Sequence, residues 1–297
     1  MIRAALVGAA LFAFATQARA EEFTYAPPGE LTEGSGEGRA DATIYAPGLR
    51  FPMEVGPAYA NSQVWGNGGG EGEGNQCDAV NFSYPWRDNY CESRRWEMPL
   101  CPSGTGHQGQ DIRAADCTKD EHWVVAVTDG TITQIGGYTV YLTDADGTRY
   151  DYLHMSNVQV ERGDEVVRGQ RLGKVSNQFG GTPTTVHLHF NILQTLDGVG
   201  SVFVPPYTSL VAAYQELLDP SPKDAGVDSG ASSSSSSGGP EEVDAGGSSG
   251  APNEAPVLDE ELEEGCACDA HAGVPLGHGM LLAIVGLVLR RKRNPRS

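Results

Sequence analysis

The sequence has few basic residues for its length, and this shortage limits the partners that the protein can have. It contains 20 lysines and arginines against 39 aspartates and glutamates, for a formal net charge of −19. Between residues 21 and 220, where the folded part is expected, 27 acidic residues face 12 lysines and arginines. Binding to nucleic acid relies on basic residues that neutralise phosphates. We therefore expect no nucleic-acid partner.

Internal repeats and the periodicity of amphipathic helices are also scarce. No repeat of about 20 to 50 residues is visible, which argues against a solenoid or a propeller. The longest strongly apolar stretch near the C-terminus, residues 279–289, is shorter than the roughly 20 residues that an ordinary membrane-spanning helix needs. One sizeable domain of short strands is therefore expected between residues 21 and 220.

Residues 1–20 have the three parts of a secretory signal peptide. Arg3 supplies a positive charge, residues 4–15 are apolar, and Ala18-Arg19-Ala20 forms a cleavage site. An N-terminal membrane anchor is the alternative, and the short apolar run disfavours it. We predict an exported protein whose mature chain begins near Glu21.

A spacer and a C-terminal sorting signal are predicted after the folded part. Residues 221–265 are mostly Ser, Gly, Pro, Ala and acid, a composition that buries too little apolar surface to fold. In residues 266–297, Cys266 and Cys268 precede the apolar stretch and a cluster of arginines and lysine. This order resembles the C-terminal surface-sorting signals of myxobacteria. The resemblance implies a sorting protease as partner, at least transient membrane contact, and a place at the cell surface or outer envelope, or release. A plain tail anchor is the alternative.

Four cysteines inside the folded part agree with export. Cys77, Cys91, Cys101 and Cys117 form an even set, which predicts two disulfides in an oxidising compartment. All three pairings stay open at this point. A four-cysteine zinc site is disfavoured, because the set has no C-x-x-C spacing.

An all-β fold with one short C-terminal helix is predicted for residues 101–220. Turn residues, among them Asp129-Gly130 and Asp146-Gly147, separate short strands and favour antiparallel hairpins. The expected strands are 123–127, 131–135, 138–143, 148–153 and 186–192, with a further hairpin over 160–170. The helix is expected over 208–218, capped by Thr208 or Ser209.

Residues 21–100 are predicted to be a partly irregular region that contains disulfides. Their aromatic side chains are expected either to line a groove or to form a small satellite core. These side chains belong to Phe82, Tyr84, Trp86, Tyr90 and Trp96.

Three short motifs contain the residues with metal-binding chemistry. His107 and Asp111 stand four residues apart in a glycine-rich stretch that favours a tight loop entering a strand. His187 and His189 alternate with apolar residues, so on a strand they share one face. His154 ends an earlier strand. Catalytic zinc takes three ligands from His and Asp or Glu and leaves a fourth position for water, and these motifs offer such a set.

Taken together, the motifs resemble the lysostaphin and LytM family of peptidoglycan endopeptidases from about His107 to Ile192. The glycine-punctuated segment 163–173 and the sequence His187-Leu188-His189-Phe190 carry the resemblance further. Asn191 departs from it, because the family often has Glu there. The resemblance implies a lysostaphin-like antiparallel β-sheet or sandwich core.

The resemblance also implies a role for each motif residue. His107, Asp111 and His189 would bind one Zn²⁺, and His154 and His187 would be catalytic histidines beside a metal-activated water. The substrate would be the stem peptides or cross-bridges of peptidoglycan. Two alternatives stay open: a non-catalytic activator of cell-wall hydrolases with the same fold, and an exported protease that acts on Gly-rich proteins.

Overall fold

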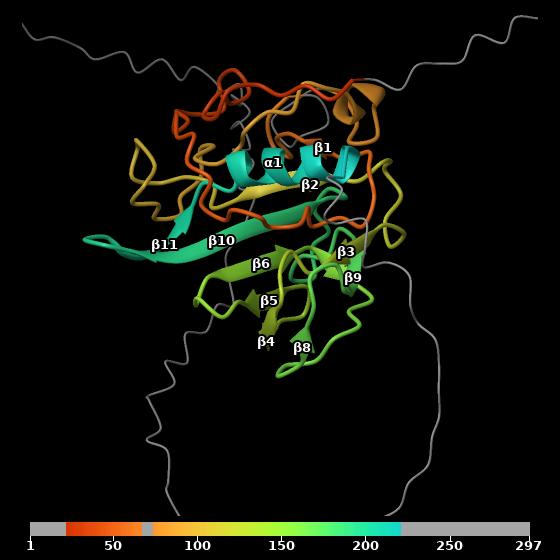
Figure 1. Cartoon of the computed structure of the whole chain (residues 1–297). Coiled ribbons are helices and arrows are strands. Elements are labelled where there is room, and N and C mark those ends of the chain that lie inside the picture. The colour runs from red at the N-terminus through yellow and green to blue at the C-terminus, as the bar shows by residue number, and fades with distance from the viewer. Residues whose placement is uncertain (1–21, 67–73, 221–297) are drawn as a thin grey trace, which may run out of the picture.

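The computed structural model describes residues 22–66 and 74–220 (Figure 1). The predicted signal peptide (1–20), spacer (221–265) and sorting signal (266–297, with Cys266 and Cys268) lie outside the described residues. In these two ranges, no helix is long and apolar enough to cross a membrane. The elements, in chain order, are β1 (Tyr59–Ala60), η1 (Ala79–Phe82), β2 (Gln110–Arg113), β3 (Trp123–Val125), β4 (Gly130–Ile135), β5 (Val140–Thr143), β6 (Arg149–Leu153), β7 (Met155–Ser156), β8 (Glu165–Val166), β9 (Arg171–Val175), β10 (Leu188–Leu196), β11 (Gly200–Val204) and α1 (Tyr207–Leu218).

Two antiparallel sheets make up the fold. The larger, eight-stranded sheet runs in the order β1-β2-β10-β6-β5-β4-β8, and β11 pairs with β10 outside this path. The smaller sheet has the order β3-β9-β7. Every pairing between these strands is antiparallel. The predicted all-β class is confirmed, and α1 is the one α-helix of the described residues.

Alternation along the strands explains why the sheet has a buried face. Val140 and Leu142 on β5 are fully buried, and the residues that alternate with them are half-buried. Leu188 and Phe190 on β10 are likewise fully buried. Since successive side chains of a strand point to opposite faces, these residues build the core from one side of the sheet.

Two local predictions are wrong because distant partners decide these segments. Residues 160–170 do not form a hairpin of their own: β8 pairs with β4 and β9 pairs with β3 and β7. Neither Thr208 nor Ser209 caps the helix, which begins at Tyr207 after Pro206. The Ser209 hydroxyl instead accepts a hydrogen bond from the amide of Ala46, 3.1 Å away.

The two Asp-Gly dipeptides serve different purposes. Gly147 has a φ of 82°, as the predicted tight turn requires. Gly130 begins β4, where an added Cβ would lie 2.4 Å from the carbonyl oxygen of Thr143. Glycine is therefore needed at position 130 for close strand approach.

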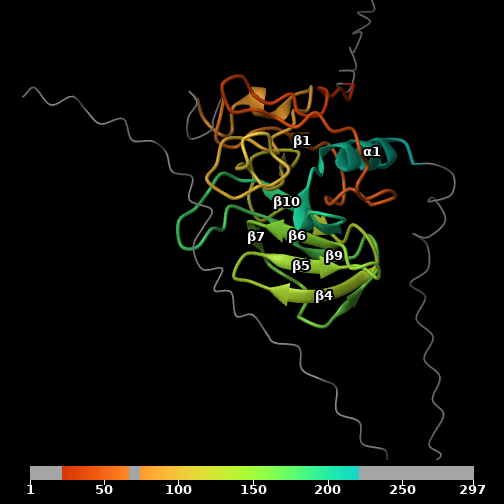
Figure 2. The same ribbon diagram turned by 90° about the vertical axis from the view of Figure 1, so that its left-hand side faces the viewer.

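The irregular N-terminal segments pack onto the same core as the sheets. Figures 1 and 2 show them, in red to orange, gathered around α1 and the β1–β2 end of the main sheet. Phe51 and Trp86 are fully buried members of the main hydrophobic cluster, and Trp86 stacks on Tyr214 of α1 with 4.5 Å between ring centroids. Of the aromatic set predicted from the sequence, Trp86 is buried in the main core and Tyr84 packs against it, whereas Tyr90 and Trp96 belong to a smaller cluster with Met98.

Two disulfides are present, as predicted, and the structure selects one of the three pairings. Cys77 is bonded to Cys117, and Cys91 is bonded to Cys101. The second bridge closes a loop whose first two residues contact the backbone of His107. The amide of Cys91 donates to the carbonyl of His107 at 3.1 Å, and the amide of His107 donates to the carbonyl of Glu92 at 2.8 Å.

Candidate active site

Strand register brings the three predicted motifs to one place. Asp111 on β2 lies opposite His189 on β10, and His189 also lies opposite Leu153 on β6. His154 follows Leu153 directly, and His187 pairs with Ser176 just before β10 begins. Residues far apart in the chain therefore meet at the same end of three neighbouring strands.

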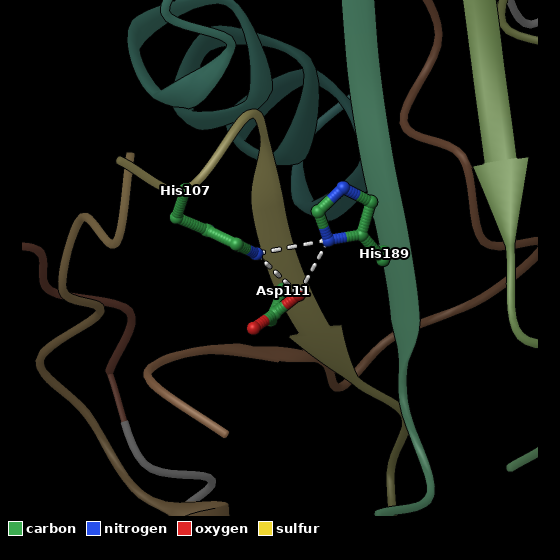
Figure 3. Close-up of side chains that lie close together, drawn as sticks. All are labelled: His107, Asp111 and His189. Atoms are coloured by element: carbon green, nitrogen blue, oxygen red, sulfur yellow. Dashed lines mark hydrogen bonds and ion pairs between the residues drawn. The ribbon is translucent and has the colours of Figure 1, made fainter. Parts of the chain in front are cut away.

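The polar atoms of these side chains converge on one carboxylate oxygen. Asp111 Oδ1 lies 2.9 Å from His189 Nδ1, 3.4 Å from His107 Nε2 and 3.4 Å from His187 Nε2. His107 Nε2 and His189 Nδ1 are 3.0 Å apart, as Figure 3 shows. All of these residues are buried. The structure thus gathers His107, Asp111 and His189 as a group that is able to hold a metal ion.

Carbonyl groups fix the tautomer of each histidine from outside the site. The Nδ1–H groups of His107, His154 and His187 donate to main-chain carbonyl oxygens at 2.9 Å. His189 is turned the other way, and its Nε2–H donates to the side-chain oxygen of Asn191 at 2.6 Å. Because a carbonyl only accepts, the proton must lie on the outer nitrogen of each neutral ring. The acceptors are the carbonyls of Asn89, Gln178 and Thr185 and the side chain of Asn191.

Burial favours the neutral form of His107 and His154, and neighbouring histidines keep the Asp111 carboxylate charged. Burial lowers the pKa of His107 to about 4, although the Asp111 carboxylate opposes this shift. Burial also lowers the pKa of His154 well below its usual range. For Asp111, burial alone would raise the pKa, but His107 and His187 outweigh it and hold the pKa well below its usual value. The inner nitrogens of His107 and His154 therefore present lone pairs at neutral pH.

This arrangement fits a divalent transition metal. Two inward lone pairs 3.0 Å apart and a carboxylate oxygen 2.9 Å from one of them would repel one another unless a cation or proton lay between them. Nitrogen ligands from histidine with one carboxylate suit Zn²⁺ better than Mg²⁺ or Ca²⁺, which prefer oxygen ligands. The four described cysteines are bonded in pairs and offer no thiolate. The donor set thus matches the three-ligand pattern of catalytic zinc.

His154 is held in a backbone conformation that is costly for a residue with a side chain. Its φ is +65°, in the left-handed region. The ring packs against Phe179 with 5.5 Å between centroids, and it lies 4.6 Å from the ring of His187. Strained conformations of this kind cluster at functional sites, where the surrounding structure maintains them.

Gly109 permits the close approach of the first motif to β10. A Cβ at this position would lie 2.2 Å from the side-chain oxygen of Asn191 and 2.3 Å from the carbonyl oxygen of Phe190. The sequence predicted a tight loop in this glycine-rich stretch. The specific need is room for the strand that carries His189.

Asn89 is a site residue that the sequence reasoning missed. Its side chain donates to Asp111 Oδ2 at 2.8 Å and accepts from the Asp111 amide at 3.0 Å, and its carbonyl accepts from His107. One residue therefore orients two members of the metal-binding group, as outer-shell partners of metal ligands do. No pattern marks it, because it lies in an irregular segment.

Asn191, where the sequence departs from the lysostaphin pattern, contacts His189. Its side-chain oxygen accepts a hydrogen bond from the Nε2–H of His189. Its side-chain nitrogen lies 3.5 Å from Asp151 Oδ2. Asp151 is itself bound to Arg149 at 2.7 Å. An amide at position 191 thus supplies the acceptor that orients His189.

The site opens into a pocket whose walls come from three segments. Residues 63–64 form one part, Arg94 and Trp96 another, and Phe179 with Thr184 a third. The metal-binding group, His154 and His187 line its floor. Of the aromatic set predicted for the N-terminal region, Trp96 is the member that lines this pocket.

One segment of the chain matches a known protein family. Residues 105–200 match the family model of peptidase family M23, and they include all five predicted site residues. Protease LasA of Pseudomonas aeruginosa is 30% identical over 122 residues, which is 37% of this chain and 28% of LasA. Glycyl-glycine endopeptidase ALE-1 of Staphylococcus capitis is 33% identical over 118 residues, 37% of this chain and 31% of ALE-1.

Among solved structures, the catalytic domain of the antimicrobial peptidase lysostaphin from Staphylococcus simulans is 27% identical. The match covers 39% of this chain and 89% of that domain, with a TM-score of 0.28. The chain spans less than a third of the length of the curated relatives above. The comparisons therefore support a peptidase domain over residues 105–200, and the walls formed by residues 63–64, Arg94 and Trp96 precede that segment.

Proposed function

We propose that this protein is a zinc-dependent endopeptidase that hydrolyses peptide cross-links in bacterial peptidoglycan. The observation that carries the proposal is the set of inward-facing imidazole lone pairs around the buried carboxylate of Asp111. The match to peptidase family M23 supports amide hydrolysis as the reaction. The names of LasA, a protease, and ALE-1, a glycyl-glycine endopeptidase, agree with it.

His107 Nε2, Asp111 Oδ1 and His189 Nδ1 would hold the zinc. When bound, zinc supplies a Lewis acid that lowers the pKa of water toward about 7 and polarises the scissile carbonyl. The chain's own contribution is orientation. Asn89 and Asn191 hold the ligand rings and the carboxylate in place, so that no ligand has to reorganise during the reaction.

His154 and His187 would move protons. Both rings donate from Nδ1 to main-chain carbonyls, so the lone pair of each neutral ring lies on Nε2, and that of His187 is 3.4 Å from Asp111 Oδ1. A neutral imidazole beside the site is able to accept the proton of the attacking water and then to donate it to the leaving amine. The protonated ring would also stabilise the negative charge that develops on the carbonyl oxygen.

Export is part of the proposal. Disulfides form and persist in oxidising compartments, and both cysteine pairs of the described residues are bonded. The predicted signal peptide, which lies outside the described residues, points the same way. A place at the cell surface rests on the predicted sorting signal alone.

The deciding experiment is digestion of purified peptidoglycan by the purified, zinc-loaded protein. Mass spectrometry of the released fragments should show peptide bonds opened between stem peptides or within cross-bridges. The same protein treated with a chelator, and a His189→Ala variant, should release none. A Gly-rich protein digested in parallel tests the protease alternative.

Two outcomes would contradict the proposal. Cleavage of the Gly-rich protein without cleavage of peptidoglycan would favour the exported protease. Failure of the zinc-loaded protein to cut either material, together with stimulation of another wall hydrolase, would favour the non-catalytic activator.

A further inference from the structure

Arg94 places a permanent positive charge on the wall of the pocket. It lines the pocket together with His107, Asp111 and His187. Arginine stays protonated at any pH at which the protein folds, whereas the histidines of the site are able to be neutral. The described residues that line the pocket include this one arginine and no lysine. A cation here also runs against the acidic balance of the chain.

The disulfide-closed loop fixes the position of Arg94. Cys91 and Cys101 are bonded, and the amide of Gly106 donates to the carbonyl of Trp96 at 3.0 Å. The amide of Ser93 donates to the carbonyl of Ser35 at 2.7 Å and ties the loop to the N-terminal segment. The backbone that carries Arg94 is thus held on both sides.

The guanidinium is also held, but its donors are not used up. Nη1 donates to the carbonyl of Ser93 at 2.8 Å, and Nη2 donates to Glu92 Oε2 at 3.1 Å. The Arg94 side chain is 12% exposed and that of Glu92 is 0% exposed. A guanidinium has more N–H donors than these two contacts use, in a planar fork that matches a carboxylate. Because its rotamer is already fixed, little further entropy is lost on binding.

We propose that Arg94 is a specificity-determining residue that binds a free carboxylate of the substrate beside the scissile amide. The proposal rests on the proposed function. The preferred substrates would be peptides that carry a negative charge next to the cleaved bond, and an uncharged glycine chain would be a poorer substrate. The carboxylate is either on a side chain or at a C-terminus, and the two sources share the same recognition chemistry.

The competing explanation is that Arg94 only braces Glu92. A brace would support the pocket wall for every substrate equally, whereas recognition acts only on substrates that carry the charge. The ratio of kcat/KM between matched charged and uncharged peptides therefore separates the two roles.

The test uses three synthetic peptides with the same scissile bond. One carries a side-chain carboxylate beside it, one carries a C-terminal carboxylate there, and in the third both groups are carboxamides. The zinc-loaded full chain should cleave at least one carboxylate peptide with a kcat/KM about tenfold or more above the carboxamide, as a charge-assisted bidentate contact allows. In Arg94→Gln this ratio should fall to about one, through loss on the carboxylate peptide alone.

Arg95→Gln is the matched control, because it makes the same chemical change at the neighbouring, exposed position. It should keep the wild-type ratio. Arg94→Lys should retain part of the ratio, since the charge remains and the fork is lost. Unfolding temperatures of the variants check that the loop still folds.

Binding to the metal-free protein separates this proposal from the proposed function. After removal of zinc, calorimetry should show the carboxylate peptide binding about tenfold more tightly than the carboxamide, and Arg94→Gln should abolish the difference. This result would stand even if the zinc-loaded protein cut none of the peptides. Two results would overturn the proposal. One is that the wild type binds and cleaves the carboxylate peptides and the carboxamide peptide equally. The other is that Arg94→Gln loses as much kcat/KM on the carboxamide peptide as on the carboxylate peptides.

Discussion

The regions before and after about residue 105 contribute to the site in different ways. The later region is built of sheets, and their register places His189 between Asp111 and Leu153, the residue before His154. The earlier region has one two-residue strand and one short 3-10 helix among its described residues. It supplies Asn89, which orients the metal-binding group, and Arg94 on the pocket wall. The later region therefore supplies the reacting groups, and both regions help to orient them.

Irregular backbone is able to position site residues here because side chains fasten it to the sheet domain. The Tyr214 hydroxyl of α1 accepts from the amide of Ala58 at 2.9 Å, and the Tyr207 hydroxyl donates to the carbonyl of Ala26 at 3.0 Å. Trp86 Nε1 donates to the carbonyl of Ala58 at 2.8 Å. These buried bonds replace the ladder that regular strands would provide.

The largest effect is expected from removing a metal-binding residue that the sheets carry. His189→Ala should remove zinc and activity together, because it deletes a central ligand of a three-ligand site. Elemental analysis should show about one zinc per chain in the wild type and almost none in the variant. His122→Ala is the control, since His122 contacts Asp116 outside the pocket. Zinc lost in His187→Ala but kept in His189→Ala would mean that the other histidine is the ligand.

The next effect separates proton transfer from metal binding on the same side. His154→Ala and His187→Ala should each lower kcat by about a hundredfold or more, the range for general acid–base groups and oxyanion donors. Zinc content and unfolding temperature should stay near the wild-type values. A stable, zinc-loaded His154→Ala variant with full activity would exclude His154 from the reaction.

A smaller effect is expected when the irregular region loses its hold on the ligands. Asn89→Ala removes the side-chain bonds to Asp111 and should weaken zinc affinity or activity by about tenfold to a hundredfold. Zinc titration followed by activity measurement checks this. Excess zinc should restore most of the activity if the loss is one of affinity. Unchanged zinc affinity and activity would show that the sheet holds Asp111 without help.

The smallest effect on activity, and the sharpest test of the comparison, comes from the two disulfides. Chain-entropy arguments predict that the loss of Cys77–Cys117, which closes 40 residues, costs about 4 kcal/mol of unfolding free energy, and that the loss of Cys91–Cys101, which closes 10, costs about 3 kcal/mol. The order for activity should be reversed, because the shorter loop confines Arg94 more tightly and the amide of Cys91 itself donates to the carbonyl of His107. A double Cys→Ser variant is made for each bridge. Denaturant unfolding ranks their losses of stability, and peptidoglycan cleavage, at rates several-fold above background, ranks their losses of activity. A larger loss of activity in the Cys77/Cys117 variant would contradict the assignment.

The amino-acid sequence alone determined the elements whose signals are local. Alternation around His187 and His189 predicts a strand with two imidazoles on one face, and that pattern needs no distant partner. The glycine beside His107 predicts a tight loop, and the even cysteine set predicts two bridges. The five predicted site residues came from such motifs together with the resemblance of their order to a known family.

Only the tertiary structure decided what depends on distant partners. The segment 160–170 has the local signs of a hairpin, yet β8 pairs with β4 because that pairing completes the large sheet. Ser209 has the character of a helix cap, yet its hydroxyl serves the amide of Ala46. The cysteine pairing, the hold of Asn89 on Asp111 and the place of Arg94 on the pocket wall follow the same rule. Each depends on contacts between segments far apart in the chain, for which periodicity and composition carry no signal.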